Sequence, residues 1–226
     1  AFSPEGTRIA TVSWDATVRL WDANSGERVL DLSGHHSPVV DVAFSEDGGR
    51  LATAGWDGAM KVWDAISGEE LASFSRDEAD LFSIAVGPDG RRVATAGTDS
   101  MARVWDGDSG EELHVLGGHT NWVRDVVFNS DGTRVATGSD DGTAMIWDAE
   151  SGEVMRTLAG HTGPVYGVAF SPGRARLATA SADGRVTLWE TTSGGELRRL
   201  EGHGAGVWDV AFSPDGARIV TAGMDG

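Results

Sequence analysis

The chain has 226 residues and a formal net charge of −17, from 18 Lys and Arg against 35 Asp and Glu. This acidity argues against nucleic acid or an anionic membrane as the main partner, because both carry negative charge. There is no Cys, which excludes disulfides and thiolate metal sites. The length and an apolar content of 40% fit one domain over residues 1–226 with its own core.

Short alternating or β-branched segments separated by turn residues predict strands, and the second repeat of the chain shows them clearly. No segment has the apolar period of a long helix. In chain order, the predicted strands of this repeat are 39–45 (VVDVAFS), 50–55 (RLATAG), 59–65 (AMKVWDA) and 69–74 (EELASF).

The same pattern recurs at a fixed spacing along the chain. A Trp-acid dipeptide occurs every 42 residues (63 − 21 = 42), at Trp21-Asp22, Trp63-Asp64, Trp105-Asp106, Trp147-Asp148 and Trp189-Glu190. Large apolar residues recur at four positions of the repeat, which in the second repeat are Phe44, Leu51, Val62 and Phe74. Four short antiparallel strands per repeat make one propeller blade, and the apolar positions are expected to pack blade against blade.

These motifs resemble the Trp-Asp (WD) repeat family of β-propellers, and the resemblance covers the whole chain. It implies a scaffold that binds other proteins or peptides and has no active site or cofactor. We expect an all-β propeller of four-stranded antiparallel blades, with five 42-residue repeats and a partial one. Since the family most often has seven blades, we expect part of a larger ring.

Two other arrangements of the ends stay open. The terminal strands could close a smaller ring through a shared blade, or separate chains could complete each other. If the terminal blades are open, they would self-associate, because an uncovered blade face is apolar. The chain begins inside a repeat, at Ala1-Phe2-Ser3-Pro4, so we expect the natural N-terminus to be missing.

Each complete repeat also places a His, a Thr, an Asp and a Trp in register. Thr, His and Asp together resemble a nucleophile, a base and an orienting acid. Catalysis needs one such set, however, and here the set recurs, so we expect the buried hydrogen-bond chain that the resemblance implies. The sets are His35, Thr53, Asp57, Trp63; His119, Thr137, Asp141, Trp147; and His161, Thr179, Asp183, Trp189.

The pattern is interrupted in two repeats. Arg76-Asp77 replaces Gly-His in the third set, which predicts a rearranged loop over 76–80 and a locally weaker blade. Gly173-Arg174 stands where other repeats have Asp-Gly or Glu-Gly, which predicts one altered turn. The segment 106–110 (DGDSG) resembles the start of a calcium loop but lacks the distal ligands, so we interpret it as a hairpin turn.

Aromatic residues and one Arg occupy three further columns whose chemistry varies between repeats. The resemblance implies that these columns line the rim of one ring face, where partners dock. Aromatic residues and Arg are also the usual anchors of protein interfaces. The predicted partner-binding residues are Trp14, Trp56, Phe82, Trp122, Arg124, Tyr166 and Trp208.

Two other functions are alternatives to this scaffold or sensor role. A lectin-like propeller would use exposed Trp and Asp on a sugar, but would repeat the same pocket around the ring. A hydrolase would need one set that differs from the others, and the deviant third set has lost its His. A single Lys among many Arg suggests a bacterial source, and we expect a cytoplasmic location, although the lack of Cys leaves the compartment open.

Overall fold

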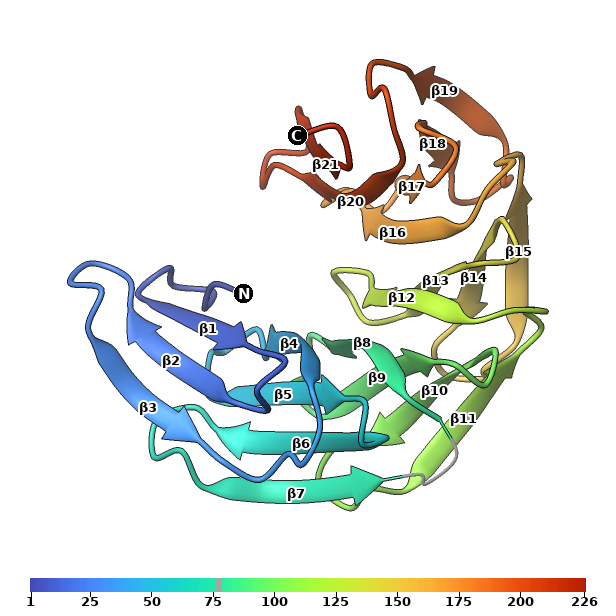
Figure 1. Ribbon diagram of the computed structural model, residues 1–226. Helices are drawn as coiled ribbons and strands as arrows, with labels where there is room; N and C mark the ends of the chain where they lie inside the picture. Colours follow the sequence, from blue (N-terminus) through green and yellow to red (C-terminus); the bar gives the residue numbers. More distant parts are fainter. Residues whose placement is uncertain (76–78) are drawn as a thin grey trace. The chain divides into compact units, whose positions relative to one another are not determined.

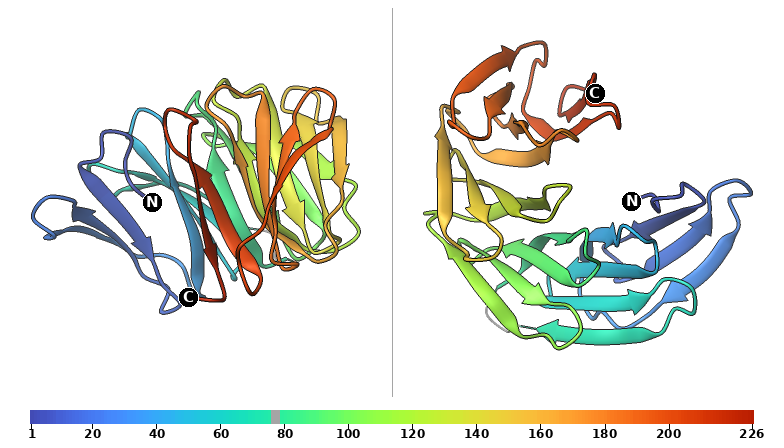
Figure 2. Two further views of the ribbon diagram at one scale, coloured as in Figure 1. Left: turned by 90° about the horizontal axis from the view of Figure 1, so that it is seen from above. Right: turned by 180° about the vertical axis from the view of Figure 1, so that it is seen from behind.

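The computed structural model describes residues 1–75 and 79–226, and every regular element in these residues is a β-strand (Figure 1). Within them there is no helix able to cross a lipid bilayer. The strands form six antiparallel sheets, four with four strands, one with three and one with two. Within each sheet, neighbouring strands are also neighbours in the sequence, which the gradual change of colour makes visible (Figure 2). The chain is therefore all-β and built from repeats, as the sequence predicts.

The six sheets are named here by their order in the chain. Sheet 1 contains β1 (Arg8–Val12), β2 (Val18–Asp22) and β3 (Arg28–Leu32); sheet 2 contains β4 (Val39–Phe44), β5 (Arg50–Gly55), β6 (Ala59–Asp64) and β7 (Glu70–Ser75). Sheet 3 contains β8 (Leu81–Val86), β9 (Arg92–Gly97), β10 (Met101–Asp106) and β11 (Glu112–Gly117); sheet 4 contains β12 (Val123–Phe128), β13 (Arg134–Ser139), β14 (Thr143–Asp148) and β15 (Val154–Ala159). Sheet 5 contains β16 (Val165–Phe170), β17 (Arg176–Ser181), β18 (Val186–Glu190) and β19 (Glu196–Leu200); sheet 6 contains β20 (Val207–Phe212) and β21 (Ile219–Gly223).

The recurring acid after each Trp has a local structural role that explains its position. Asp64 Oδ1 accepts hydrogen bonds from the backbone N–H groups of Ile66 (2.9 Å) and Ser67 (2.7 Å), which closes the turn into β7. Glu190, the one Glu of the column, holds the backbone N–H groups of Thr192 and Ser193 in the same way. Side-chain acceptors of this kind form turns because they replace a backbone partner.

The described residues divide into two compact units. Unit 1 comprises 1–99 and 103–113, and unit 2 comprises 100–102 and 114–226, so the division runs through sheet 3.

Within each unit, the core lies between consecutive sheets rather than inside one. In unit 1, Leu20 of sheet 1 packs with Leu51 and Trp63 of sheet 2, and all three are at most 2% exposed. In unit 2, Ile146 of sheet 4 packs with Leu177 of sheet 5 in the same way. Full burial of one such side chain contributes roughly 1.5–3 kcal/mol, so stacked neighbours stabilise each sheet.

A carboxylate joins the first strands of successive sheets at two points. Asp41 Oδ2 accepts the backbone N–H of Ile84 (2.8 Å) in unit 1, and Asp125 Oδ2 accepts that of Val168 (2.8 Å) in unit 2. Burial raises the pKa of Asp41, against the lowering effect of the N–H groups of Ile84 and Val42. The two Asp residues share one repeat position, a signal that the sequence carried and that our sequence analysis did not use.

Candidate functional site

The His, Thr, Asp and Trp of each complete set form one continuous hydrogen-bond chain. In the fourth repeat, the indole N–H of Trp147 donates to Thr137 Oγ1 (2.9 Å). Thr137 Oγ1 lies 2.8 Å from His119 Nε2, and His119 Nδ1 lies 2.8 Å from Asp141 Oδ2. These hydrogen bonds connect the loop before β12 with β13 and with the turn before β14.

The other two complete sets repeat this geometry within their own units. In unit 1, His35 lies 2.8 Å from Thr53 Oγ1 and 3.0 Å from Asp57 Oδ2, and Trp63 donates to Thr53 at 3.0 Å. In unit 2, the corresponding distances for His161 are 2.7 Å to Thr179 and 3.0 Å to Asp183, with 2.9 Å for Trp189 to Thr179. The three Thr residues are 0% exposed, so their hydroxyl groups are closed off from solvent.

Protonation of the imidazoles follows from their surroundings. Burial lowers the pKa of His119, and Asp141 opposes this shift; the pKa of His35 is lowered for the same reason against Asp57. Burial would raise the pKa of Asp141, but hydrogen bonds from Thr143, Thr120 and His119 hold it below its usual value. A neutral His119 beside an ionised Asp141 donates from Nδ1 and accepts the Thr137 O–H at Nε2.

The third repeat has a different partner for its turn Asp. Trp105 Nε1 donates to Thr95 Oγ1 (2.8 Å) as in the other sets, but Asp99 Oδ2 forms an ion pair with Arg103 Nη2 (2.5 Å) from β10. Arg103 is 7% exposed, and its Nε also lies 3.3 Å from Glu112 Oε2. Arg76 and Asp77 are outside the described residues, so the predicted rearrangement of their loop stays a prediction.

The predicted altered turn at Gly173-Arg174 is wrong. Arg174 has φ 62°, close to the φ of 69° at the equivalent Gly132, and its backbone N–H donates to Ser171 O (2.8 Å). The turn keeps its shape because the surrounding hydrogen bonds hold Arg174 in the left-handed conformation that Gly adopts without cost.

The column of Phe82, Arg124, Tyr166 and Trp208 lies at a β-bulge in the first strand of each of sheets 2 to 6. In unit 2 the register shifts between Val165 and Gly167 and again between Val207 and Asp209, at Tyr166 and Trp208. A bulge removes one residue from the ladder and can redirect its side chain. The indole of Trp208 and the ring of Tyr166 stack with centroids 4.4 Å apart and an interplanar angle of 22°.

Arg124 extends this stack toward Trp122. Its guanidinium carbon lies 4.9 Å from the Trp122 ring centroid and 5.9 Å from that of Tyr166. Asp140 holds the guanidinium through two bonds, at 2.8 Å to Nε and 2.7 Å to Nη2. Four of the predicted partner-binding residues therefore form one ordered group in unit 2, in which Trp122 and Trp208 are 43% and 49% exposed.

The remaining predicted residues lie in unit 1. Trp14 and Trp56 occupy equivalent turns and meet with ring centroids 5.5 Å apart at 43°. Trp14 is 73% exposed and Trp56 37%, whereas Phe82 lies at the bulge of β8. The prediction that all seven residues share one surface stays a prediction.

Asp140 and Arg103, the partners of these groups, are not among the residues predicted from the sequence. Asp140 is the one carboxylate in the column of Trp14 and Trp56, and Arg124 is the one Arg in the column of Tyr166 and Trp208. These two opposite charges were the available signal. For Arg103 the signal was a basic column, with Arg19 and Lys61 at the equivalent positions.

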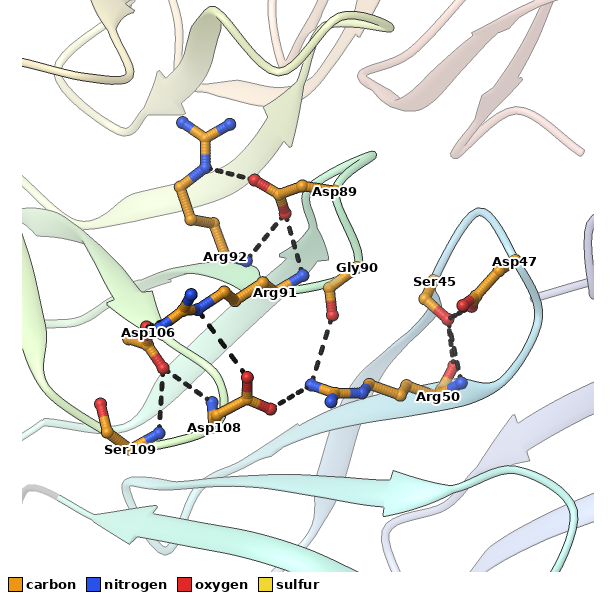
Figure 3. Close-up of polar contacts among 10 residues, drawn as sticks. All are labelled: Ser45, Asp47, Arg50, Asp89, Gly90, Arg91, Arg92, Asp106, Asp108 and Ser109. Atoms are coloured by element: carbon orange, nitrogen blue, oxygen red, sulfur yellow. Dashed lines mark hydrogen bonds and ion pairs between the residues drawn. The ribbon is translucent and has the colours of Figure 1, made fainter.

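The carboxylates of segment 106–110 face arginines (Figure 3). Asp106 Oδ2 accepts from Arg91 at 2.8 Å, and Asp108 Oδ1 accepts from Arg50 at 2.6 Å. The backbone N–H of Ser109, and then the N–H of Asp108 and the guanidinium of Arg91, lower the pKa of Asp106 to about 2, although burial acts in the opposite direction. Among the described residues, no group of three or more His, Asp or Glu is placed to hold a metal ion.

A comparison with known families identifies the repeats. The model of the WD domain, G-beta repeat, matches residues 1–22, 26–64, 68–106, 110–148, 152–190 and 194–226. Among curated proteins, none matches the chain. With six matches that together cover nearly all of its residues, and with the turn acids and sheets described above, the chain belongs to the WD-repeat family.

Proposed function

We propose that this protein is a non-catalytic scaffold or sensor domain that binds other proteins or peptides through its aromatic groups. WD repeats generally mediate interactions between proteins. The observation that carries the proposal is the stack of Tyr166 on Trp208 beside Arg124, in which Trp208 is 49% exposed. Rigid aromatic and Arg side chains make good interface anchors, because little side-chain entropy is lost when a partner covers them.

The buried Thr sets support the non-catalytic part of the proposal. A Thr nucleophile must reach a substrate, but the hydroxyl of Thr137 is fully buried and already occupied by Trp147 and His119. These groups satisfy each other, which suits a structural role.

The lectin-like alternative has less support. Sugar recognition by Trp14 and Trp56 would need free polar groups beside the rings. Asp15 already accepts from the hydroxyl (2.6 Å) and N–H (3.1 Å) of Thr17, and Asp57 is held by His35. We therefore rank protein docking above sugar binding.

The test is a comparison of captured partners with matched surface variants. Trp208→Ala and Tyr166→Ala should each reduce the recovery of the partners bound by the wild-type chain by about tenfold or more, which is the effect of losing an interface anchor. Leu197→Ala is the control, because Leu197 is also in unit 2 and 52% exposed but lies on the outer strand β19. Equal recovery by wild type and both aromatic variants, with unchanged melting temperatures, would remove the assignment.

A further inference from the structure

An Arg lies at or just before the start of the second strand of every repeat, and in the first, second and fourth repeats its guanidinium reaches a loop of the following sheet. Arg8 Nη1 donates to Ala65 O and Nη2 to Gly48 O (2.9 Å). Arg50 Nη1 donates to Asp108 Oδ1 (2.6 Å) and lies 3.5 Å from Gly90 O (Figure 3). The column consists of Arg8, Arg50, Arg92, Arg134, Arg176 and Arg218.

Arg134 in unit 2 is less well satisfied than these equivalents. Among the residues that the structure describes, its guanidinium donates one hydrogen bond, from Nη1 to Thr191 Oγ1 at 3.2 Å. The carbonyl of Arg174, which corresponds to those of Gly48 and Gly90, accepts instead from Thr191 Oγ1 at 2.8 Å. Within 1–75 and 79–226, no carboxylate forms an ion pair with Arg134.

Sequence changes at this junction explain the spare donors. Thr192 occupies the position of Asp108, so the carboxylate that binds Arg50 has no counterpart beside Arg134. Ala175 occupies the position of Arg91, and its small side chain leaves the space open. The result is a polar groove of about 260 Å³ in unit 2, lined in part by Asp131, Thr133, Arg134, Arg174, Thr191 and Thr192.

Arg174 adds a second cation to the groove at a conformational cost. A residue other than Gly at φ 62° is strained, because its Cβ crowds the following carbonyl. Its guanidinium forms an ion pair with Asp131, whose pKa is lowered to about 2 by hydrogen bonds from Thr133 and by Arg174. Among the residues that line the groove, two guanidinium groups stand against the one carboxylate of Asp131, and Asp148, the cross-strand neighbour of Arg134, also interacts electrostatically with Arg134.

We infer that this groove binds an oxyanion, a carboxylate or a phosphoryl group, on Arg134, in the place that Asp108 takes on Arg50. Between the second and third repeats, the oxyanion on the Arg is the carboxylate of Asp108. Between the fourth and fifth repeats, the oxyanion on Arg134 comes from outside the chain. The group comes either from a free ion or from an acidic or phosphorylated side chain of a partner, since both offer the same oxygens to a guanidinium.

The test follows the Nε–Hε resonances of the arginines by NMR while inorganic phosphate or acetate is added to the full chain. Arg134, assigned by its loss in Arg134→Gln, should shift in a saturable way. Thr192→Asp, at an exposed position, supplies the carboxylate in cis and should weaken binding by about tenfold or more without removing any cation. Arg50→Gln is the control and should bind like wild type, because Asp108 already occupies that site.

Two further arms distinguish the sources of the oxyanion. Short peptides with phosphothreonine or Glu should bind more tightly than phosphate or acetate if a partner side chain is the ligand. Equal affinities would identify a free ion. The inference is overturned if neither anion moves the Arg134 resonance, or if Thr192→Asp binds phosphate as well as wild type does.

Discussion

Asp99 forms its ion pair with Arg103, four residues along the same hairpin, whereas the equivalent Asp57, Asp141 and Asp183 each hold a His. The third repeat thus keeps a cationic or N–H partner for its turn carboxylate, although the imidazole is absent from its sequence. This partner comes from β10, inside the sheet.

Removing this partner should destabilise the chain. In Arg103→Ala, Asp99 loses its ion pair in a largely buried place, and we expect the free energy of unfolding to fall by about 1–3 kcal/mol. Arg198→Ala, on the exposed outer strand β19, is the control and should leave stability unchanged. Urea unfolding of both variants measures the difference, and equal midpoints would contradict a structural role for the pair.

The buried sets should be equally sensitive to loss of their hydroxyl. Thr137→Ala leaves the Trp147 indole N–H and His119 Nε2 without their shared partner, which should cost about 1–3 kcal/mol. Thr162→Ala removes an exposed hydroxyl in a loop and serves as the matched control. The measurement is the melting temperature, which should fall in the first variant alone.

Acidification should destabilise the protein in two stages. The pKa of His119 in the folded chain lies below its usual value of 6.5, so the unfolded chain binds the proton first and stability falls as the pH drops through about 6.5. The lowered pKa of Asp141 adds a second loss below pH about 4, because protonation again favours the unfolded chain. Denaturant unfolding between pH 7.5 and about 2.5 follows both stages, because the second loss continues as the pH falls through the lowered pKa of Asp141.

His119→Gln separates these two effects. The variant has no imidazole at this position, so the slope of stability against pH should decrease between pH 7 and 5.5 while the lower stage persists. A slope identical to that of wild type in the upper range would show that His119 does not titrate in this way.

Gly167 controls the stacking of Tyr166 on Trp208. A Cβ at residue 167 would lie 3.0 Å from Trp208 O and 3.1 Å from Asp209 Cα, so Gly allows β20 to approach β16. Gly167→Val should separate the rings, which near-ultraviolet circular dichroism detects, and should weaken partner binding. Gly117→Val is the control, since nothing lies within 4 Å of a Cβ there. An unchanged spectrum in Gly167→Val would reject this role of Gly167.

Much of the fold could be predicted from the sequence because each strand is bounded by local turn chemistry. Segments 39–45, 50–55, 59–65 and 69–74 agree with β4 to β7 within one residue at each end. The turn at Arg174 could not be predicted, since the left-handed propensity of Arg is poor and the hydrogen bonds that hold it belong to the folded structure.

The candidate site was less predictable for a related reason. Repeat columns show which residues are equivalent, but the bonds of Arg124 with Asp140 and of Asp41 with Ile84 connect different columns. A carboxylate that accepts a backbone N–H does not require a particular side chain on the donating residue. The sequence therefore shows Asp41 but does not identify its partner.

The β-bulge at Tyr166 and Trp208 has a consequence for how such a chain can change over generations. A side chain at a bulge is released from the cross-strand pairing that restricts its neighbours, so its identity can be exchanged without disturbing the sheet. Val40, Phe82, Arg124, Tyr166 and Trp208 already occupy this one position within a single chain. A duplicated repeat can therefore acquire a new specificity by one substitution while its scaffold is inherited intact.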